Sequence, residues 1–205
     1  MKSVHFIVAA AIAVAIGTGA TSSRGGTADP ALDFSSSSST NDDTGYSMGY
    51  EFTVNQNLTV AALGYYDAGG VNSGLTSGHV VGIYNLSGGL LTSATVTSAD
   101  PLTGHFRYAA ISPISLTAGQ SYFVVGVTGT TDDYAWGVNG LTVDPAITFL
   151  DTYYIASSTL AVPTTSNSDL YLAGSFELSG VPEPTSLALL GLGASILFAR
   201  RRRIA

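Results

Sequence analysis

Residues 50–66 read YEFTVNQNLTVAALGYY, and this stretch decides the class of fold. In Tyr50–Val54 the apolar side chains alternate with Glu51 and Thr53. This period of two is that of a strand with one buried face. After a short polar turn, Leu58–Tyr66 is apolar on both faces, which predicts a central strand that is covered on both sides.

The same kind of pattern recurs along the rest of the chain. Further predicted strands are His79–Asn85, Leu90–Thr97, Phe106–Ile111, Ser121–Val127, Thr152–Ala156 and Leu170–Leu178. Leu86–Gly89 joins the first two as a hairpin, with glycines where the turn needs a positive φ. Between the two ends no window has a helical period. The sequence therefore predicts an all-β fold, a two-sheet antiparallel β-sandwich of the jelly-roll kind, over residues 45–179.

The composition excludes several classes of function. Only 10% of the residues are charged, against about 25% in typical soluble proteins. The absence of cysteine rules out disulfides, thiolate metal sites and cysteine nucleophiles. Residues 21–180 hold 13 acidic side chains and two arginines, a formal net charge of −11. Nucleic acid is therefore excluded as a partner, because phosphate binding needs clustered Lys and Arg.

Residues 1–20 have the pattern of a secretory signal peptide. Lys2 supplies the positive start, Phe6–Ile16 is uninterrupted and apolar, and Thr18-Gly19-Ala20 offers small residues for cleavage. The apolar stretch is shorter than the roughly 20 residues that span a bilayer. The alternative, an N-terminal core helix, is disfavoured because no polar face interrupts the stretch.

Residues 21–44 form a polar, Ser-rich leader that includes Ser35–Ser39. Such a stretch buries too little apolar area to order itself. The leader is predicted to be either a linker or a first strand around Ala31–Phe34 followed by a loop.

The C-terminal end combines three features. Val181-Pro182-Glu183-Pro184 precedes the uncharged stretch Thr185–Ala199, and four arginines follow. The uncharged stretch would make a single hydrophobic helix of about 22 Å, short for a hydrocarbon core of about 30 Å. The arginines hold their end in the cytoplasm, so the bulk of the chain lies on the other side of the membrane.

This order of Pro-Glu-Pro, short apolar span and basic end resembles the PEP-CTERM sorting signal, here assigned to residues 180–205. The sorting-motif residues are Pro182, Glu183, Pro184, Arg200, Arg201, Arg202 and Arg203. The resemblance implies recognition by an exosortase, a membrane-embedded, transpeptidase-like sorting enzyme that would act near Pro-Glu-Pro. The apolar segment would then be a transient membrane anchor, and the alternative is a permanent one.

The resemblance also implies a setting. Such proteins are exported by Gram-negative bacteria, pass the inner membrane, and reach the cell envelope, the outer surface or the extracellular matrix. They are associated with exopolysaccharide or biofilm. A non-catalytic exported protein of this kind is the primary functional hypothesis.

The middle of the chain carries a second resemblance. Leu63–Gly70, followed by Gly74-Leu75 and by His79–Tyr84, is similar to a β-sandwich domain of unknown function that recurs in PEP-CTERM proteins. The similarity runs from about residue 46 to 178 and implies no activity. Relatives often have another acid in the glycine-rich loop, where this chain has Val71-Asn72, so a metal or ligand role for that loop is not supported.

No catalytic residues are predicted. The chain lacks Gly-x-Ser-x-Gly and His-Glu-x-x-His motifs. We expect His79 to form a hydrogen bond to a loop backbone or to Asp67, and His105 to lie on the surface. Glu51 and Glu177 are expected on solvated faces of strands, which disfavours a carboxylate pair for glycoside hydrolysis. The chain is therefore predicted not to be an enzyme, and a hydrolase of unfamiliar type is the least favoured alternative.

Two weaker patterns concern ligands. Asp42-Asp43 and Asp132-Asp133 could give oxygens to a structural calcium ion, although neither matches EF-hand spacing and paired aspartates also form turns. No other cofactor is predicted.

Several aromatic side chains cluster near predicted strand ends. The members of this set are Tyr65, Tyr66, Tyr134, Trp136, Tyr153 and Tyr154. Aromatic rings stack on sugar faces, which makes a carbohydrate-binding module the alternative function. The candidate ligand-binding residues are Tyr65, Asp67, Tyr134 and Trp136. About half of the rings must belong to the core, because adjacent residues in a strand point to opposite faces.

Overall fold

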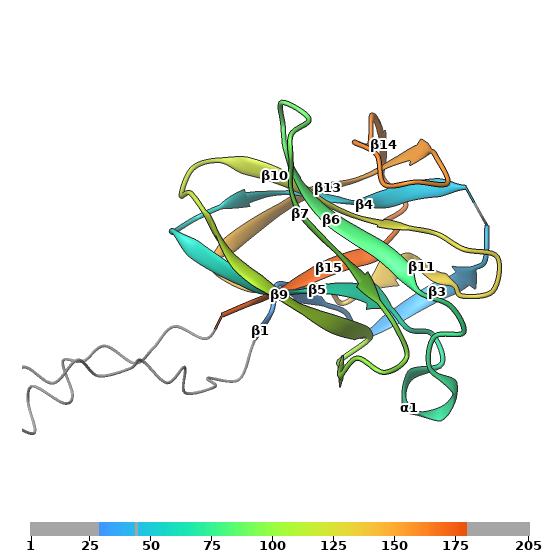
Figure 1. Cartoon of the computed structure of the whole chain (residues 1–205). Coiled ribbons are helices and arrows are strands. Elements are labelled where there is room, and N and C mark those ends of the chain that lie inside the picture. Colours follow the sequence, from blue (N-terminus) through green and yellow to red (C-terminus); the bar gives the residue numbers. More distant parts are fainter. Residues whose placement is uncertain (1–28, 44, 180–205) are drawn as a thin grey trace, which may run out of the picture.

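The computed structural model describes residues 29–43 and 45–179 (Figure 1). The expected signal peptide (1–20) and the expected C-terminal hydrophobic helix lie outside these residues. The described chain is almost entirely β, with one four-residue helix, α1 (Gly70–Ser73). None of its helices has the length and apolar character needed to cross a membrane.

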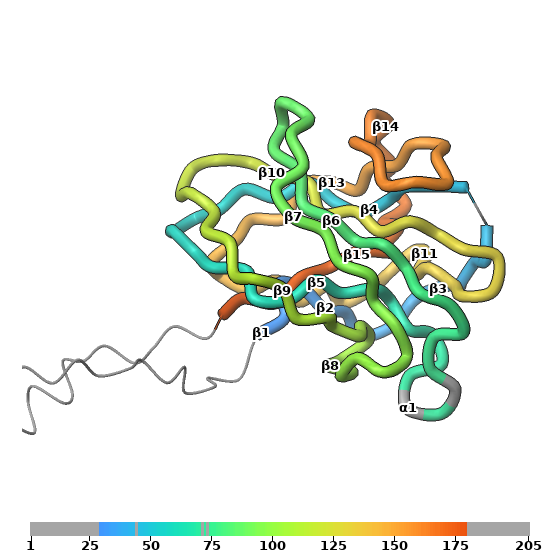
Figure 2. The backbone as a smooth tube through the Cα atoms, viewed as in Figure 1, coloured from blue at the N-terminus to red at the C-terminus, as the bar shows by residue number. Residues whose placement is uncertain are grey.

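Two antiparallel sheets form the sandwich, which confirms the predicted fold class (Figures 1 and 2). The six-stranded sheet has the order β14 (Thr165–Asn167), β13 (Ile147–Ala156), β4 (Tyr46–Val54), β10 (Ser121–Val127), β6 (His79–Asn85) and β7 (Leu90–Val96). The five-stranded sheet has the order β1 (Asp29–Pro30), β15 (Gly174–Leu178), β5 (Leu58–Tyr66), β9 (Phe106–Leu116) and β8 (Leu102–Thr103). Two small ribbons pair β11 (Tyr134–Asn139) with β3 (Ser36–Asn41) and β12 (Thr142–Val143) with β2 (Leu32–Asp33).

The alternation in β4 creates the core face of the six-stranded sheet. Tyr50, Phe52 and Val54 are fully buried, whereas Glu51 and Thr53 between them are partly exposed. The ring of Phe52 lies 4.8 Å from that of Phe176 on β15, centroid to centroid, so the two sheets interdigitate here. The expected central strand β5 lies between β15 and β9 and is buried along most of its length.

A second, smaller apolar cluster covers the opposite face of the six-stranded sheet. Its buried members are Tyr84, Phe123 and Val125. The partly buried Tyr153, Leu160 and Val162 pack against them. The loop that follows β13 therefore shields part of this face, and β10 is buried on both sides.

The start of the domain differs from the expected boundary at residue 45. Part of the expected leader forms β1, β2 and β3, and Ala31, Leu32 and Phe34 within it are buried in the main core. The backbone N–H of Ala31 donates to the carbonyl of Phe176 at 2.9 Å. The serines of β3 are ordered by ladder pairing with β11 rather than by their own burial, which a composition argument cannot detect. The domain therefore begins by residue 29.

Both ends of the described chain lie at one end of the sandwich, at the left of Figure 1. β1 pairs with β15 in the antiparallel sense, so Asp29 lies opposite Leu178. We call this end, where Leu58 and Leu116 also pair, the tether pole. The other end of β5, about 26 Å away at 3.3 Å per residue, leads to α1 and is called the distal pole.

The two sheets approach each other closely where two glycines face one another. A Cβ atom on Gly174 would lie 2.7 Å from the carbonyl carbon of Val125 and 2.8 Å from the nitrogen of Gly126. These are backbone atoms and cannot turn aside. The absence of a side chain at Gly174 is therefore a condition for β15 to pack on β10.

We expect the replacement Gly174→Ala to lower the free energy of unfolding by about 3 kcal/mol, because the added methyl group overpacks the space between two backbones. Gly119→Ala is the matched control. Gly119 has a φ of +77°, and a methyl group there would meet no heavy atom within 4 Å, so only backbone strain of about 1 kcal/mol is expected. Urea unfolding measures both, and equal losses would contradict the steric explanation.

Candidate functional site

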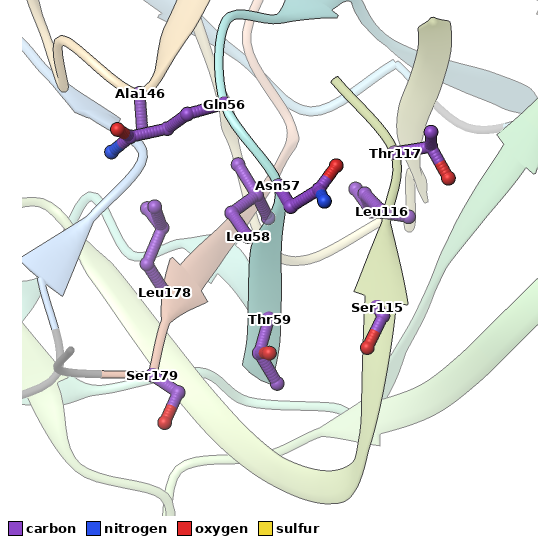
Figure 3. Close-up of a pocket in the computed structure, with 10 residues that line it drawn as sticks. All are labelled: Gln56, Asn57, Leu58, Thr59, Ser115, Leu116, Thr117, Ala146, Leu178 and Ser179. Carbon is purple, nitrogen blue, oxygen red and sulfur yellow. The ribbon is translucent and has the colours of Figure 1, made fainter. Parts of the chain in front are cut away.

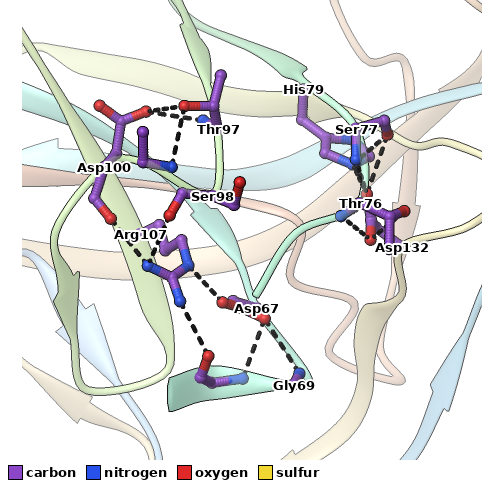
Figure 4. Close-up of polar contacts among 12 residues, drawn as sticks. Asp67, Gly69, Thr76, Ser77, His79, Thr97, Ser98, Asp100, Arg107 and Asp132 are labelled. Atoms are coloured by element: carbon purple, nitrogen blue, oxygen red, sulfur yellow. Dashed lines mark hydrogen bonds and ion pairs between the residues drawn. The ribbon is translucent and has the colours of Figure 1, made fainter. Parts of the chain in front are cut away.

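The distal pole holds two polar clusters side by side (Figure 4). The first is centred on Arg107 of β9, whose Nε donates to the carboxylate of Asp67 at 2.5 Å. Its Nη1 donates to the carbonyls of Ser98 and Asp100, and its Nη2 to the carbonyl of Gly70. One guanidinium thus ties the loop after β5 to the loop after β7.

Asp67 is fully engaged within this cluster. Its Oδ1 accepts hydrogen bonds from the backbone N–H groups of Gly69 and Gly70, both at 3.0 Å, while Oδ2 faces Arg107. The residue is buried. Asp67 therefore caps the first turn of α1 and has no hydrogen bond to His79, which corrects one of the two partners expected for that histidine.

The second cluster is centred on His79. Its Nδ1 lies 3.0 Å from the carbonyl oxygen of Val127, a backbone group at the end of strand β10 rather than in a loop, and its Nε2 lies 2.9 Å from Oδ2 of Asp132. The imidazole also stacks on the ring of Tyr65, with centroids 3.8 Å apart and planes at 12°. Ser77 places its Oγ 3.3 Å from the same Nε2.

Ser77, His79 and Asp132 resemble a hydrolytic triad in composition but not in geometry. In a triad the nucleophile and the acid contact opposite ring nitrogens, so that the base can take a proton from one side and be oriented from the other. Here both contact Nε2, and Nδ1 faces a carbonyl. The exposed fraction of His79 is only 2%. The arrangement therefore suits a structural clamp and not a nucleophilic site.

Asp132 is held as a carboxylate by its surroundings. Burial by itself would raise the pKa of Asp132, but hydrogen bonds from His79, from Thr76 and from Ser77 outweigh it and hold that pKa well below its usual range. The backbone and hydroxyl groups of Thr76 and Ser77 all donate to it, at 2.7–2.9 Å. Asp132 thereby fastens the loop before β11 to the start of β6.

The expected calcium ligands are placed apart. The carboxylate of Asp132 already accepts hydrogen bonds from Thr76, Ser77 and His79. Asp43 accepts a hydrogen bond from Asn41 at 3.0 Å. In residues 29–43 and 45–179, no three His, Cys, Asp or Glu side chains gather where a metal ion could be held. The structure thus brings neither Asp42-Asp43 nor Asp132-Asp133 into a larger oxygen cage.

The expected carbohydrate ligands do not form one site either. Tyr65 is fully buried against His79, Asp67 is bonded to Arg107, and Tyr134 is buried next to Asn41. Only Trp136 presents its side chain to solvent, with an exposed fraction of 39%. Of the four residues, Trp136 alone can meet a ligand without rearrangement of the core.

Trp136 lies at one end of a line of four aromatic rings. The sequence did not indicate two of them, Tyr46 and Tyr171. Ring centroids are separated by 6.0 Å from Trp136 to Tyr171, by 6.5 Å from Tyr171 to Tyr154 and by 6.0 Å from Tyr154 to Tyr46. The three tyrosines are half-buried. We call these four residues the aromatic row. Tyr171 joins it because Leu172 bridges to Ala135, a long-range contact without a local sequence signal.

A pocket of about 410 Å³ opens at the tether pole (Figure 3). Leu58, Leu116 and Leu178 line it together with the uncharged polar side chains of Asn57 and Ser115. Among the described residues, the side chains that line this pocket include no titratable group and so offer neither an acid nor a base for chemistry.

Two comparisons define what kind of protein this is. Residues 180–203, shortly after the end of β15, match the PEP-CTERM protein-sorting motif, so the chain carries this sorting signal. The matched range includes the Pro-Glu-Pro triplet and all four arginines. The motif marks the chain for export through the membrane to the cell surface and implies an exosortase-type sorting partner.

The folded part has its own family. Residues 33–173 match the family described as Domain of unknown function (DUF4082), and the chain belongs to that family. Neither matched family is a catalytic one. No curated protein and no solved structure matches the chain.

We expect the pH dependence of stability to report on Asp132. A carboxyl group with a lower pKa in the folded state stabilises the fold near neutral pH, and this contribution is lost as the pH falls below about 4, the pKa of Asp in an unfolded chain. Asp132→Asn should therefore lose about 2 kcal/mol near neutral pH, and the difference from the wild type should shrink in acid. Urea unfolding, followed by the fluorescence of the single tryptophan, measures this.

Glu177 supplies a control, because its pKa is shifted in the opposite direction to that of Asp132. The sequence predicts it on a solvated face, but it is buried, and burial, with the charge of Asp29 nearby, raises its pKa despite a hydrogen bond from Thr103. Glu177→Gln should therefore be at least as stable as the wild type near neutral pH, and its advantage should vanish in acid. If the difference in stability from the wild type changed with pH in the same direction in both variants, the pH dependence could not be assigned to the pKa values of Asp132 and Glu177.

Proposed function

We propose that this protein is a non-catalytic passenger that is sorted to the envelope, outer surface or extracellular matrix of a Gram-negative bacterium, where it is associated with exopolysaccharide or biofilm. The observation that carries the proposal is the position of the chain ends. β15 ends at Leu178, and the sorting motif begins at residue 180. The sorting motif therefore begins within two residues of the last strand, and we infer that the tether pole faces the membrane.

The arrangement of charged and aromatic groups supports the proposal. The hydrogen bonds of Arg107, His79 and Asp132 are all satisfied by the fold itself, so the distal pole is built for rigidity. The half-exposed rings of the aromatic row, in contrast, lie on the outside of the domain. A stable domain that makes contacts through its surface suits display at the cell surface better than it suits enzymatic catalysis.

Removal of residues 180–205 tests the sorting part of the proposal. We expect the truncated protein to keep the thermal midpoint of the full chain, because the two sheets and their core are complete within the described residues, which end at Ser179, whose N–H donates to the carbonyl of Thr59. It should no longer be sorted, as measured by cell fractionation. The full chain with Pro182, Glu183 and Pro184 changed to Ala is the control, because it loses the Pro-Glu-Pro triplet but keeps the apolar segment and the arginines. Normal sorting of either variant, or unfolding of the truncated one, would contradict the proposal that residues 180–205 serve sorting while the preceding domain folds without them.

Carbohydrate binding through the aromatic row is the second candidate function. Trp136 lies opposite Ser39 in the ladder of β11 and β3, so an exposed indole stands beside a strand of hydroxyl groups. Indole rings stack on sugar faces, and hydroxyl groups can hydrogen-bond to sugar edges. Successive ring planes meet at 64–71°, so a sugar chain would contact ring edges as well as faces.

We expect Trp136→Ala to weaken binding to an acidic or neutral bacterial exopolysaccharide at least tenfold, because one good stacking contact contributes about 1.4 kcal/mol or more. Leu150→Ala, at an equally exposed apolar side chain on β13, should leave binding unchanged. Affinity electrophoresis in gels containing the polysaccharide measures both. If the wild type is not retarded by any polysaccharide tried, the aromatic row is not a glycan site and the display function stands alone.

A further inference from the structure

The six-stranded sheet ends in a long strand with a free edge. β7 is the last strand in the sheet order, and the ladder pairs it with β6 alone. Its inner face packs on the core through the buried Val96, while Leu91, Ser93 and Thr95 on its outer face are exposed. One row of its backbone N–H and C=O groups therefore has no ladder partner among the residues that the structure describes.

Other edges of the described sheets carry protection against edge-to-edge pairing, which in natural sheets comes from short strands, charges or proline. β1 and β8 have two residues each, and β14 has three. The part of β9 beyond β8 contains Pro113. β3 is followed by Asp42 and Asp43, whose charges repel a second acidic chain.

β7 has none of these devices. It reads LLTSATV, with seven residues and no charge or proline. Between Asp67 and Asp100 the chain contains no Asp, Glu, Lys or Arg. Residues 21–180 carry a formal net charge of −11, so the β6–β7 hairpin is a surface where two copies can approach without facing carboxylates.

The same hairpin presents apolar side chains to solvent. The exposed fractions are 38% for Val80, 53% for Leu86, 49% for Leu90 and 41% for Leu91. Val80 lies opposite Thr95 in the β6–β7 ladder, so Val80 and Leu91 share one face of the sheet. These four side chains adjoin the smaller apolar cluster through Leu90, which lies close to Gly82 and Leu160. We call them the hairpin strip.

We propose that a second copy of this chain pairs with β7 through its own β7, in the antiparallel sense about a two-fold axis near Ser93. The two six-stranded sheets then form one continuous sheet. Leu91 faces the partner's Thr95, which lies next to the partner's Val80, so the two hairpin strips lie side by side on one face of the joined sheet. Because both copies use the same surface, the contact closes on itself and gives a dimer rather than a fibre. This pairing is independent of the proposed carbohydrate site.

The absence of cysteine permits a direct test in the full-length chain, purified in mild detergent. We expect Ser93→Cys to be cross-linked to a dimer by a short bis-maleimide, because residues near the axis of an antiparallel pair lie within about 7 Å of each other. Ser166→Cys on β14, at the opposite edge, is the matched control and should give at least tenfold less dimer. Both variants carry the same C-terminal segment, so association through that segment would cross-link them equally and would overturn the proposal.

A charge placed on the free edge gives the second measurement. We expect Ser93→Lys to abolish the concentration-dependent dimer of the wild type in sedimentation velocity, since two lysines would meet at the axis. At concentrations where the wild type is monomeric, the thermal midpoint of Ser93→Lys should match that of Ser166→Lys, because both side chains are exposed. A wild type that stays monomeric at every concentration, a Ser93→Lys variant that still dimerises, or cross-linking that appears only with added polysaccharide or another protein would each exclude self-pairing.

Discussion

The pairing of β15 between β1 and β5 is the constraint on which the rest of the structure depends. It places the last strand of the domain inside the five-stranded sheet and brings Asp29 opposite Leu178. Phe176 then reaches Phe52 across the core, and Gly174 permits the backbones of the two sheets to touch. Because the sorting motif follows β15 in the chain, the same pairing decides at which pole of the described domain the chain leads into that motif.

The polar residues of the distal pole stabilise the fold because each charge has a partner. Arg107 serves the carbonyls of two loops in addition to Asp67, and Asp132 receives hydrogen bonds from His79, Thr76 and Ser77. A buried charge that loses its partner destabilises a protein by several kcal/mol, so these clusters define one loop arrangement. They also explain why a Ser-His-Asp grouping can occur here without the geometry of catalysis.

The hairpin strip and the pocket at the tether pole are formed by uncharged groups, whereas the hydroxyl group of Tyr171 in the aromatic row donates to Asp169. In the proposed pairing of two acidic domains an uncharged contact is favourable, because like charges repel over distances of about 10 Å in dilute salt. The sorting motif and the two proposed contact surfaces thus belong to separate parts of the chain.

The sequence by itself determined the all-β class, most of the strands and the sorting signal. These follow from local patterns, namely the alternation in Tyr50–Val54 and the order of features after Val181. Tertiary structure alone decided that the serines of β3 form a strand, that Tyr65 and Asp67 are buried, and that Tyr171 joins Trp136. Those outcomes rest on partners more than 30 residues away in the chain, as between Trp136 and Ser39, and a local pattern carries no information about which distant backbone will complete a ladder or cover a ring.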